Sequence, residues 1–217
     1  MTLNQLSHLY PYFTLAIVLA GILHFNRLKK SSIASLPVYL VIVTLLNLYA
    51  EDMLKKGQDT THLFNLLVIP LEFVYFFSLF FFLNKKRRTK WLIVLPAAVY
   101  AISFMADLFL YKNEYTYLYR RSYTTGALVL FVMALVYYYG LINSERLFRF
   151  YQDPGFWIST GLLLFYLGTL PFHITWNYTA DSFLKAFYTN KFNFYILMYL
   201  MYTCFFTSII CLRWKEK

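Results

Sequence analysis

The segment from His62 to Asn84 reads HLFNLLVIPLEFVYFFSLFFFLN, and Glu72 is its one acidic or basic residue apart from His62 itself. A helix needs ~20 mostly apolar residues to cross the hydrocarbon core of a bilayer. Directly after the segment comes the basic run KKRR at 85–88. The pattern therefore predicts one membrane-spanning helix that ends at a polar boundary.

Six further apolar segments of comparable length surround this one. The chain is 60% hydrophobic and 14% charged, a composition that a soluble domain of this length does not carry on its surface. Backbone polar groups in hydrocarbon must be satisfied within their own segment, so each crossing is expected to be a helix. We therefore expect an all-α fold in one domain over residues 1–217, a polytopic membrane bundle with seven transmembrane helices at about 9–25, 33–50, 62–84, 91–111, 122–142, 155–177 and 192–213.

The basic residues predict the orientation of this bundle. When the connections are assigned to alternate sides, thirteen Lys and Arg residues fall on one side and seven on the other. Cytoplasmic loops carry the excess of positive charge, so the amino terminus is expected outside and the carboxyl terminus in the cytoplasm. The net charge of +10 is assigned to topology and to contact with anionic membrane lipid, and no nucleic-acid partner is expected.

Glu72 is the charged residue that this arrangement places deepest in the bilayer. A charge there costs ~2.5–3.5 kcal/mol on insertion scales, which makes it a candidate functional residue. It either ties two helices together or binds a ligand, an ion or a proton. Helical spacing places His62 and Asn65 on the same face, and Pro70 removes an internal hydrogen bond beside it.

Other polar residues share the outer half of the predicted membrane region, whereas the inner half is almost entirely Leu, Phe, Ile and Val. This asymmetry predicts a polar cavity that opens outward and has Glu72 at its floor. The alternative for each outer residue is an ordinary wetted helix end. The candidate ligand-binding residues are Glu72, Asp107, His173, Asn177, Trp176, Asn65, His62, Glu51 and Asp52.

Several chemistries have no signature in the chain. The last predicted span lacks the lysine that a retinal protein needs, and no His-x-x-x-His pair is present. No phosphate-binding loop, nucleophile elbow or HExxH motif occurs. We expect no catalytic residue, metal or cofactor. Gly161 and Gly168 are seven residues apart and predict one smooth helix face for close packing.

The connection between Asn143 and Asp153 predicts a short amphipathic stretch on the membrane surface, or a docking site for a partner. A second candidate docking surface is the basic loop after the third predicted span. The candidate docking residues are Lys85, Lys86, Arg87, Arg88, Arg146 and Arg149.

Residues 153–168 read DPGFWISTGLLLFYLG and contain the motif Pro-x-Phe-Trp-Ile-Ser/Asn-x-Gly. With PLEF at 70–73 and the basic loop that follows, the chain resembles a group of small seven-helix membrane proteins widespread in Bacteroidetes. The resemblance covers most of the chain. It implies a bacterial inner-membrane location and a signalling role, since the group often neighbours sensor histidine kinases. It supplies no catalytic residues, and TLPFH at 169–173 departs from the group by being more polar and more kinked.

Three functions remain open from the sequence. The first is a receptor-like sensory subunit that signals through a separate cytoplasmic or membrane partner. The second is a small transporter or channel that uses Glu72. The third is a structural or assembly subunit in which Glu72 and Asp107 hold the bundle together.

Overall fold

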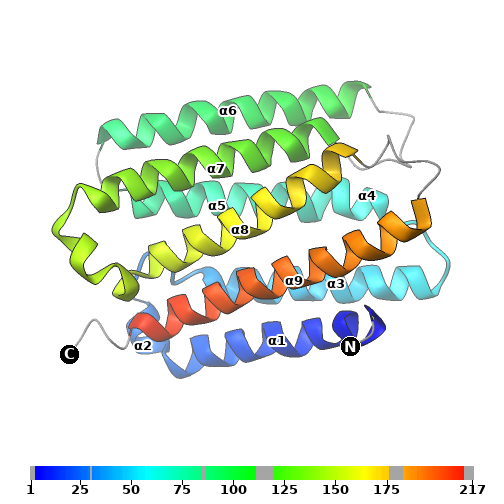
Figure 1. Cartoon of the computed structure of the whole chain (residues 1–217), viewed down its shortest axis with the longest axis horizontal. Coiled ribbons are helices and arrows are strands. Elements are labelled where there is room, and N and C mark those ends of the chain that lie inside the picture. The colour runs from blue at the N-terminus through cyan, green and yellow to red at the C-terminus, as the bar shows by residue number, and fades with distance from the viewer. Residues whose placement is uncertain (1–2, 30, 85–86, 111–119, 176–182, 213–217) are drawn as a thin grey trace. The chain divides into compact units, whose positions relative to one another are not determined.

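The computed structural model describes residues 3–29, 31–84, 87–110, 120–175 and 183–212. In these ranges every regular element is helical, which confirms the expected all-α fold (Figure 1). The long helices are α1 (Leu3–Leu23), α3 (Leu36–Lys55), α5 (Ile69–Leu83), α6 (Arg87–Leu110), α7 (Arg120–Ile142), α8 (Pro154–Thr175) and α9 (Phe183–Ile210). The short elements are α2 (Phe25–Leu28), α4 (Thr61–Leu63), the π-helical turn η1 (Phe64–Val68) and the 3-10 helix η2 (Glu145–Gln152).

Five helical segments are long and apolar enough to cross a membrane, and the chain is a membrane protein. They are Leu36–Lys55, Thr61–Leu83, Trp91–Leu110, Arg121–Ile142 and Phe192–Ile210. The first and sixth predicted spans also form helices, α1 and α8. Within the described residues their apolar parts are shorter, at Pro11–Leu23 and Pro154–Leu170.

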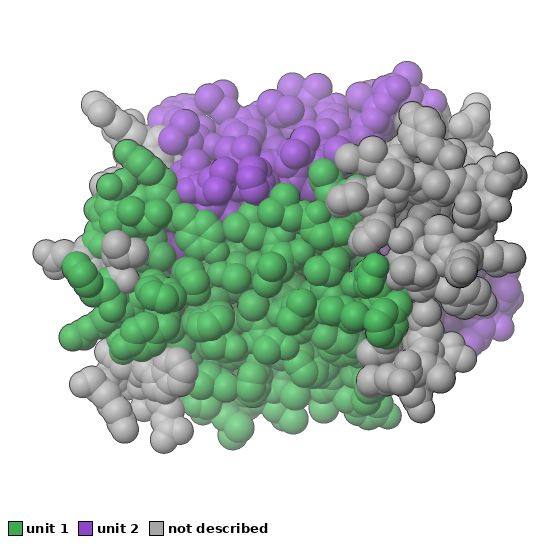
Figure 2. Space-filling model, viewed as in Figure 1, with its two compact units in different colours: residues 1–37, 138–217 green, residues 38–137 purple. Residues whose placement is uncertain are grey.

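The helices divide into two compact units, which Figure 2 colours separately. Unit 1 contains residues 1–37 and 138–217, and so joins α1 and α2 to η2, α8 and α9. Unit 2 contains residues 38–137, which form most of α3, then α4 to α6 and most of α7. Whether the two units make one folding domain, as the sequence predicts, stays a prediction.

Unit 1 is built on close approach between α8 and α9, and α1 packs on α9. A Cβ atom added at Gly161 would lie 2.9 Å from the Cys204 Cβ and 3.0 Å from the Met201 carbonyl oxygen. One added at Gly168 would lie 2.5 Å from the Leu197 side chain. Both glycines therefore face α9, which confirms the smooth helix face predicted from their spacing.

Unit 2 is built on aromatic packing. The Phe73 ring of α5 lies against Gly126 of α7, where an added Cβ would be 2.6 Å from the ring. The Phe73 centroid is 5.0 Å from that of Tyr100 and 5.9 Å from that of Tyr123, and Phe77 is 5.3 Å from Tyr100. Aromatic pairs at 4.5–7 Å add ~0.5–1.5 kcal/mol beyond their burial, so this cluster joins α5, α6 and α7.

The helix that carries Glu72 starts with a wide turn. Pro70 has no N–H to bond the carbonyl of Leu66, and the π-helical turn Phe64–Val68 directly precedes it. A π turn holds more residues than an α turn, so it displaces side chains from the predicted stripe. Asn65 is accordingly 3% exposed, whereas His62 is exposed and Glu72 is half-buried, and the three residues do not share one environment.

Candidate functional site

Asp107 lies near the end of α6 and is fully buried. Its Oδ2 accepts a hydrogen bond of 2.8 Å from the backbone N–H of Ser122, in the first turn of α7. N–H groups in the first turn of a helix have no partner within that helix, and negative charge is favourable there. One oxygen of Asp107 therefore caps the helix that follows it.

The second oxygen of Asp107 is in a different situation. Asp107 Oδ1 is buried and has no hydrogen-bond partner, and the same holds for the hydroxyl of Tyr100, a residue that is 4% exposed. In folded proteins about 90% or more of buried polar groups have a partner in the protein or in ordered water. Tyr100 precedes Asp107 by seven residues, which places both on one face of α6. Two unpartnered oxygens therefore occupy one helix face.

Glu72 belongs to the same group. The carboxyl groups of Glu72 and Asp107 both interact electrostatically with the Tyr100 hydroxyl. Glu72 comes from α5, and Tyr100 and Asp107 come from α6. We call Glu72, Tyr100 and Asp107 the acid–tyrosine cluster. The sequence singled out both acids, and both act electrostatically on one tyrosine.

Two hydroxyl groups lie next to this cluster. The Ser103 and Thr125 hydroxyls are 3.2 Å apart and join α6 to α7. Ser103 is one helical turn from Asp107, and Thr125 is one turn from Ser122, so the pair is close to the capping contact. The sequence reasoning missed Tyr100, Ser103 and Thr125. Their spacing of three and seven residues along α6 and α7 was the available signal, but tyrosine occurs 21 times in the chain and did not stand out.

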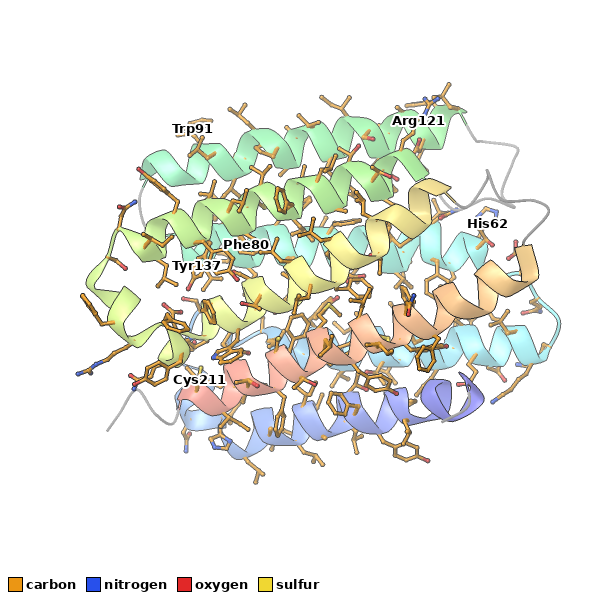
Figure 3. All side chains as sticks on the ribbon, in the orientation of Figure 1. His62, Phe80, Trp91, Arg121, Tyr137 and Cys211 are labelled. Atoms are coloured by element: carbon orange, nitrogen blue, oxygen red, sulfur yellow. The ribbon has the colours of Figure 1, made fainter. Side chains whose placement is uncertain are left out.

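Two predicted site residues form surface pairs instead. The Glu51 carboxylate is 3.0 Å from Lys55 Nζ, and the Asp52 carboxylate is 2.5 Å from Lys56 Nζ, both four residues along α3. Pairs exposed to this degree contribute ~0–1 kcal/mol to stability. Figure 3 shows His62 near the same end of unit 2 as Arg121, with Trp91 toward the other end. Asn65 is buried in the π turn.

The remaining candidates lie outside the described residues or have side chains that the structure does not describe, apart from Arg149. His173 is part of α8, but its side chain is not among those described. Trp176, Asn177, Lys85 and Lys86 lie outside the described residues. Arg87 and Arg88 are in α6 and Arg146 is in η2, and their side chains are likewise not described.

The amphipathic stretch predicted between Asn143 and Asp153 forms η2. Phe148 is 85% exposed there, and Arg149 is exposed. The indole N–H of Trp157 donates a 2.9 Å hydrogen bond to the Tyr151 carbonyl, and the Asp153 carboxylate accepts one of 3.0 Å from the Gly155 N–H. The Trp157 bond attaches η2 to the first turn of α8, and the Asp153 bond caps the start of α8.

The described part of the chain contains no group of three or more His, Cys, Asp and Glu residues that could hold a metal ion. Comparison with protein-family models, with curated proteins and with solved structures gives no match. The acid–tyrosine cluster and the exposed η2 segment are therefore the two features of the described residues that point to a function.

Proposed function

We propose that this chain is a receptor-like sensory subunit of a bacterial inner membrane. In this proposal it crosses the membrane several times, with its amino terminus outside, and it binds a small ligand at the acid–tyrosine cluster. It signals through a separate cytoplasmic or membrane protein. The observation that carries the proposal is the pair of unpartnered buried oxygens, Asp107 Oδ1 and the Tyr100 hydroxyl.

Unpartnered oxygens support binding because they leave hydrogen-bonding capacity unused. A buried polar group without a partner costs about 1–3 kcal/mol, which a suitable ligand would recover. Charged groups at membrane depth are functional candidates for the same reason. Under the proposed orientation the cluster lies toward the outer side, since Asp107 is near the end of α6 farthest from the basic run at 85–88.

The packing of unit 2 favours a receptor over a transporter. Between the cluster and the Trp91 end of the unit, the largest of the fully buried side chains are apolar. They are Phe76, Phe80, Ile93, Leu130 and Met133. Phe80 also packs with the Tyr137 ring, whose centroid is 6.3 Å away (Figure 3). An apolar layer of this kind gives an ion no polar path through the unit.

The exposed η2 segment supports signalling through a partner. Phe148 and Arg149 present an apolar ring and a positive charge on a segment that the bond from Trp157 to Tyr151 attaches to α8. Aromatic and arginine side chains dominate the binding energy of many protein interfaces. We assign to this segment the contact with the partner.

Photo-crosslinking in native membranes tests the proposal. A photoreactive phenylalanine analogue at Phe148 is expected to capture one signalling protein, identified by mass spectrometry. The same analogue at Phe109, which is 80% exposed on α6, serves as the control and is expected to capture lipid. Glu72→Gln is expected to change the yield of the captured partner. Recovery of the protein alone from both positions would contradict the proposal.

Reconstitution distinguishes the alternative functions. Ion or solute flux in proteoliposomes that disappears with Glu72→Gln would establish a transporter in place of a receptor. If Glu72→Gln and Asp107→Asn lower thermal stability but leave partner capture unchanged, the cluster has a structural role.

A further inference from the structure

We infer that η2 docks an acidic segment of the partner protein, a stretch of chain that carries Asp or Glu beside apolar side chains. This inference rests on the proposed function, in which η2 contacts a separate protein, and it names the chemical character of that partner. It is carried by the exposed side chains of Phe148, Arg149 and Tyr151, which we call the η2 surface.

Arg149 gives the η2 surface a positive charge. The ion pairs among the described side chains lie on α3 and do not involve it. The acid next to it in this connection, Asp153, accepts a hydrogen bond from the Gly155 N–H at the start of α8. A guanidinium binds a carboxylate through two parallel N–H bonds, which a lysine cannot provide. Arg149 is therefore available to a carboxylate of another protein.

The same sign of charge prevails on the side of the membrane to which η2 belongs. Under the proposed orientation the connections on that side carry thirteen Lys and Arg residues against three acidic residues, Glu145, Asp153 and Glu216. Such an imbalance attracts a negatively charged partner, speeds its encounter with the surface and repels a basic one. Charge complementarity therefore favours an acidic occupant.

Phe148 supplies the apolar part of the contact, since its ring is 85% exposed. The segment behind it is attached to α8 in two ways. The Phe150 ring centroid lies 4.9 Å from that of Phe156, and the Trp157 indole N–H bonds the Tyr151 carbonyl at 2.9 Å. A surface that is already held in position loses little conformational entropy when a partner binds.

The mixture of groups on the η2 surface favours a protein over the lipid surface. Binding of a helix to a membrane surface scales with the apolar area that it buries. Here the Phe150 ring packs on α8, and the Tyr151 hydroxyl accepts a 3.4 Å hydrogen bond from the Gln152 amide, so polar and apolar groups alternate. A few aromatic and arginine side chains are sufficient to anchor a protein interface.

Binding of a defined peptide to the full chain tests the inference. The protein is placed in phosphatidylcholine nanodiscs, and the probe is a fluorescent amphipathic peptide of Leu and Glu, with empty nanodiscs as the background. A second peptide has Gln in place of every Glu. We expect the Glu peptide to bind at least about tenfold more tightly at 0.1 M NaCl, and this advantage to shrink at 1 M, where the Debye length falls from ~10 Å to ~3 Å. Equal binding of the two peptides, or binding of neither, would overturn the inference.

Charge reversal assigns the binding to the η2 surface. Arg149→Glu is expected to weaken binding of the Glu peptide at least about tenfold, because it replaces an attraction with a repulsion. Lys29→Glu is the matched control, since Lys29 is another exposed cation of unit 1 and the change in net charge is the same. We expect it to bind the peptide as the wild type does. Equal weakening by both would show that net charge attracts the peptide, and would overturn the inference.

Two further measurements use Phe148. Phe148→Ala is expected to weaken binding of the Glu peptide about tenfold, and it keeps the inference testable if Arg149→Glu fails to fold. A photoreactive phenylalanine analogue at Phe148, in nanodiscs that also contain the anionic lipid phosphatidylglycerol, is expected to capture the Glu peptide. Capture of the lipid in the presence of the peptide would show that η2 docks on the membrane, and would overturn the inference.

The two proposals can fail separately. If the Glu peptide binds through Arg149 and the analogue at Phe148 captures no signalling protein in native membranes, the acid-binding surface stands and the receptor role is wrong. If the analogue captures a signalling protein and Arg149→Glu leaves its yield unchanged, the receptor role stands and the acidic partner is wrong.

Discussion

The two units differ in the polar bonds that join their helices. In both units hydroxyls donate to carbonyl oxygens three or four residues earlier in their own helices, as Thr14 and Ser208 do in unit 1 and Thr44 and Ser78 do in unit 2. In unit 2 Asp107 accepts from Ser122 of another helix, and Ser103 meets Thr125. Local bonds hold a helix whatever its neighbours do, whereas cross-helix bonds depend on how neighbouring helices are placed. In unit 2 the bond of a buried carboxylate therefore depends on where the next helix lies.

Unit 1 contains two exceptions to this contrast. The Tyr138 and Thr160 hydroxyls are 2.7 Å apart and come from α7 and α8, and Ser159 Oγ is buried without a partner. Among the residues that the structure describes, no charged side chain interacts with Ser159, so Ser159 shares with the cluster of unit 2 just the missing hydrogen bond. The units thus differ in the acidic residues Glu72 and Asp107, which lie in unit 2. Substitutions in both units can test this difference.

The largest effect is expected at the glycine contact of unit 1. Gly161→Ala would place a Cβ 3.0 Å from the Met201 carbonyl oxygen. This oxygen belongs to the backbone of α9, so it cannot move aside as the end of a flexible side chain can. We expect a loss of about 1–3 kcal/mol in the free energy of unfolding, as for other overpacked sites. Thermal unfolding measures it, at ~2–4 °C per kcal/mol for a chain of this size.

Gly140→Ala is the matched control, since nothing lies within 4 Å of a Cβ there and alanine favours a helix. It is expected to leave stability unchanged or slightly raised. Equal losses at Gly161 and Gly140 would show that α8 and α9 do not approach as described.

The next effect is expected at Asp107 in unit 2. Asp107→Ala leaves the Ser122 N–H without its acceptor, and we expect a loss of about 1–3 kcal/mol in stability. Asp107→Asn keeps an acceptor oxygen and should lose less. Urea or thermal unfolding in detergent measures both, and equal effects of the two substitutions would contradict the capping role.

A pair of tyrosine substitutions compares the units directly. Tyr138→Phe in unit 1 removes a hydroxyl bonded to Thr160 and is expected to lose about 0.5–1.5 kcal/mol. Tyr100→Phe in unit 2 removes an unpartnered hydroxyl, so it is expected to be neutral or stabilising. Melting temperatures of the two variants test this, and a larger loss at Tyr100 than at Tyr138 would reverse the contrast.

The smallest effect is expected at Asp59, in the connection before α4. Hydrogen bonds from the side chain and backbone of Thr61 hold the pKa of the Asp59 carboxyl below its ordinary value of 3.8. A lowered pKa stabilises the folded state above that ordinary value, and the contribution is lost as the pH falls through the folded pKa. Between pH 5 and pH 2 the wild type should therefore lose slightly more stability than Asp59→Asn. Because the group is exposed, this difference is expected to be about as small as the experimental error of a melting curve. An NMR titration of the carboxyl resolves it, and an unshifted midpoint would contradict the Thr61 contacts.

The sequence predicted the helices well because their signal is local. Runs of apolar residues bounded by charges define α5 and α7 without knowledge of any neighbour. The smooth face of Gly161 and Gly168 also followed from spacing along one helix, whereas the packing of α9 on that face did not. The division into two units did not, since it depends on contacts between α1 and α9, which are far apart in the chain.

The site could be predicted in part. Glu72 and Asp107 stood out because charges are rare among apolar residues. Tyr100 did not, since its importance depends on a missing hydrogen bond, which no spacing reveals. The π turn before Pro70 also changed which side chains share a face, so Asn65 is buried and His62 is exposed.

The make-up of unit 1 also affects the order of assembly. During translation α1 is synthesised first, whereas α9, the helix on which it packs, is synthesised after all of unit 2. Residues such as Ile17 on α1 must face lipid or a temporary companion, for instance an insertion factor, throughout that interval. Unit 2, which is continuous in the chain, has no such delay. Unit 2 should therefore fold first. The packing of α1 on α9 would then be the last step in the folding of the chain.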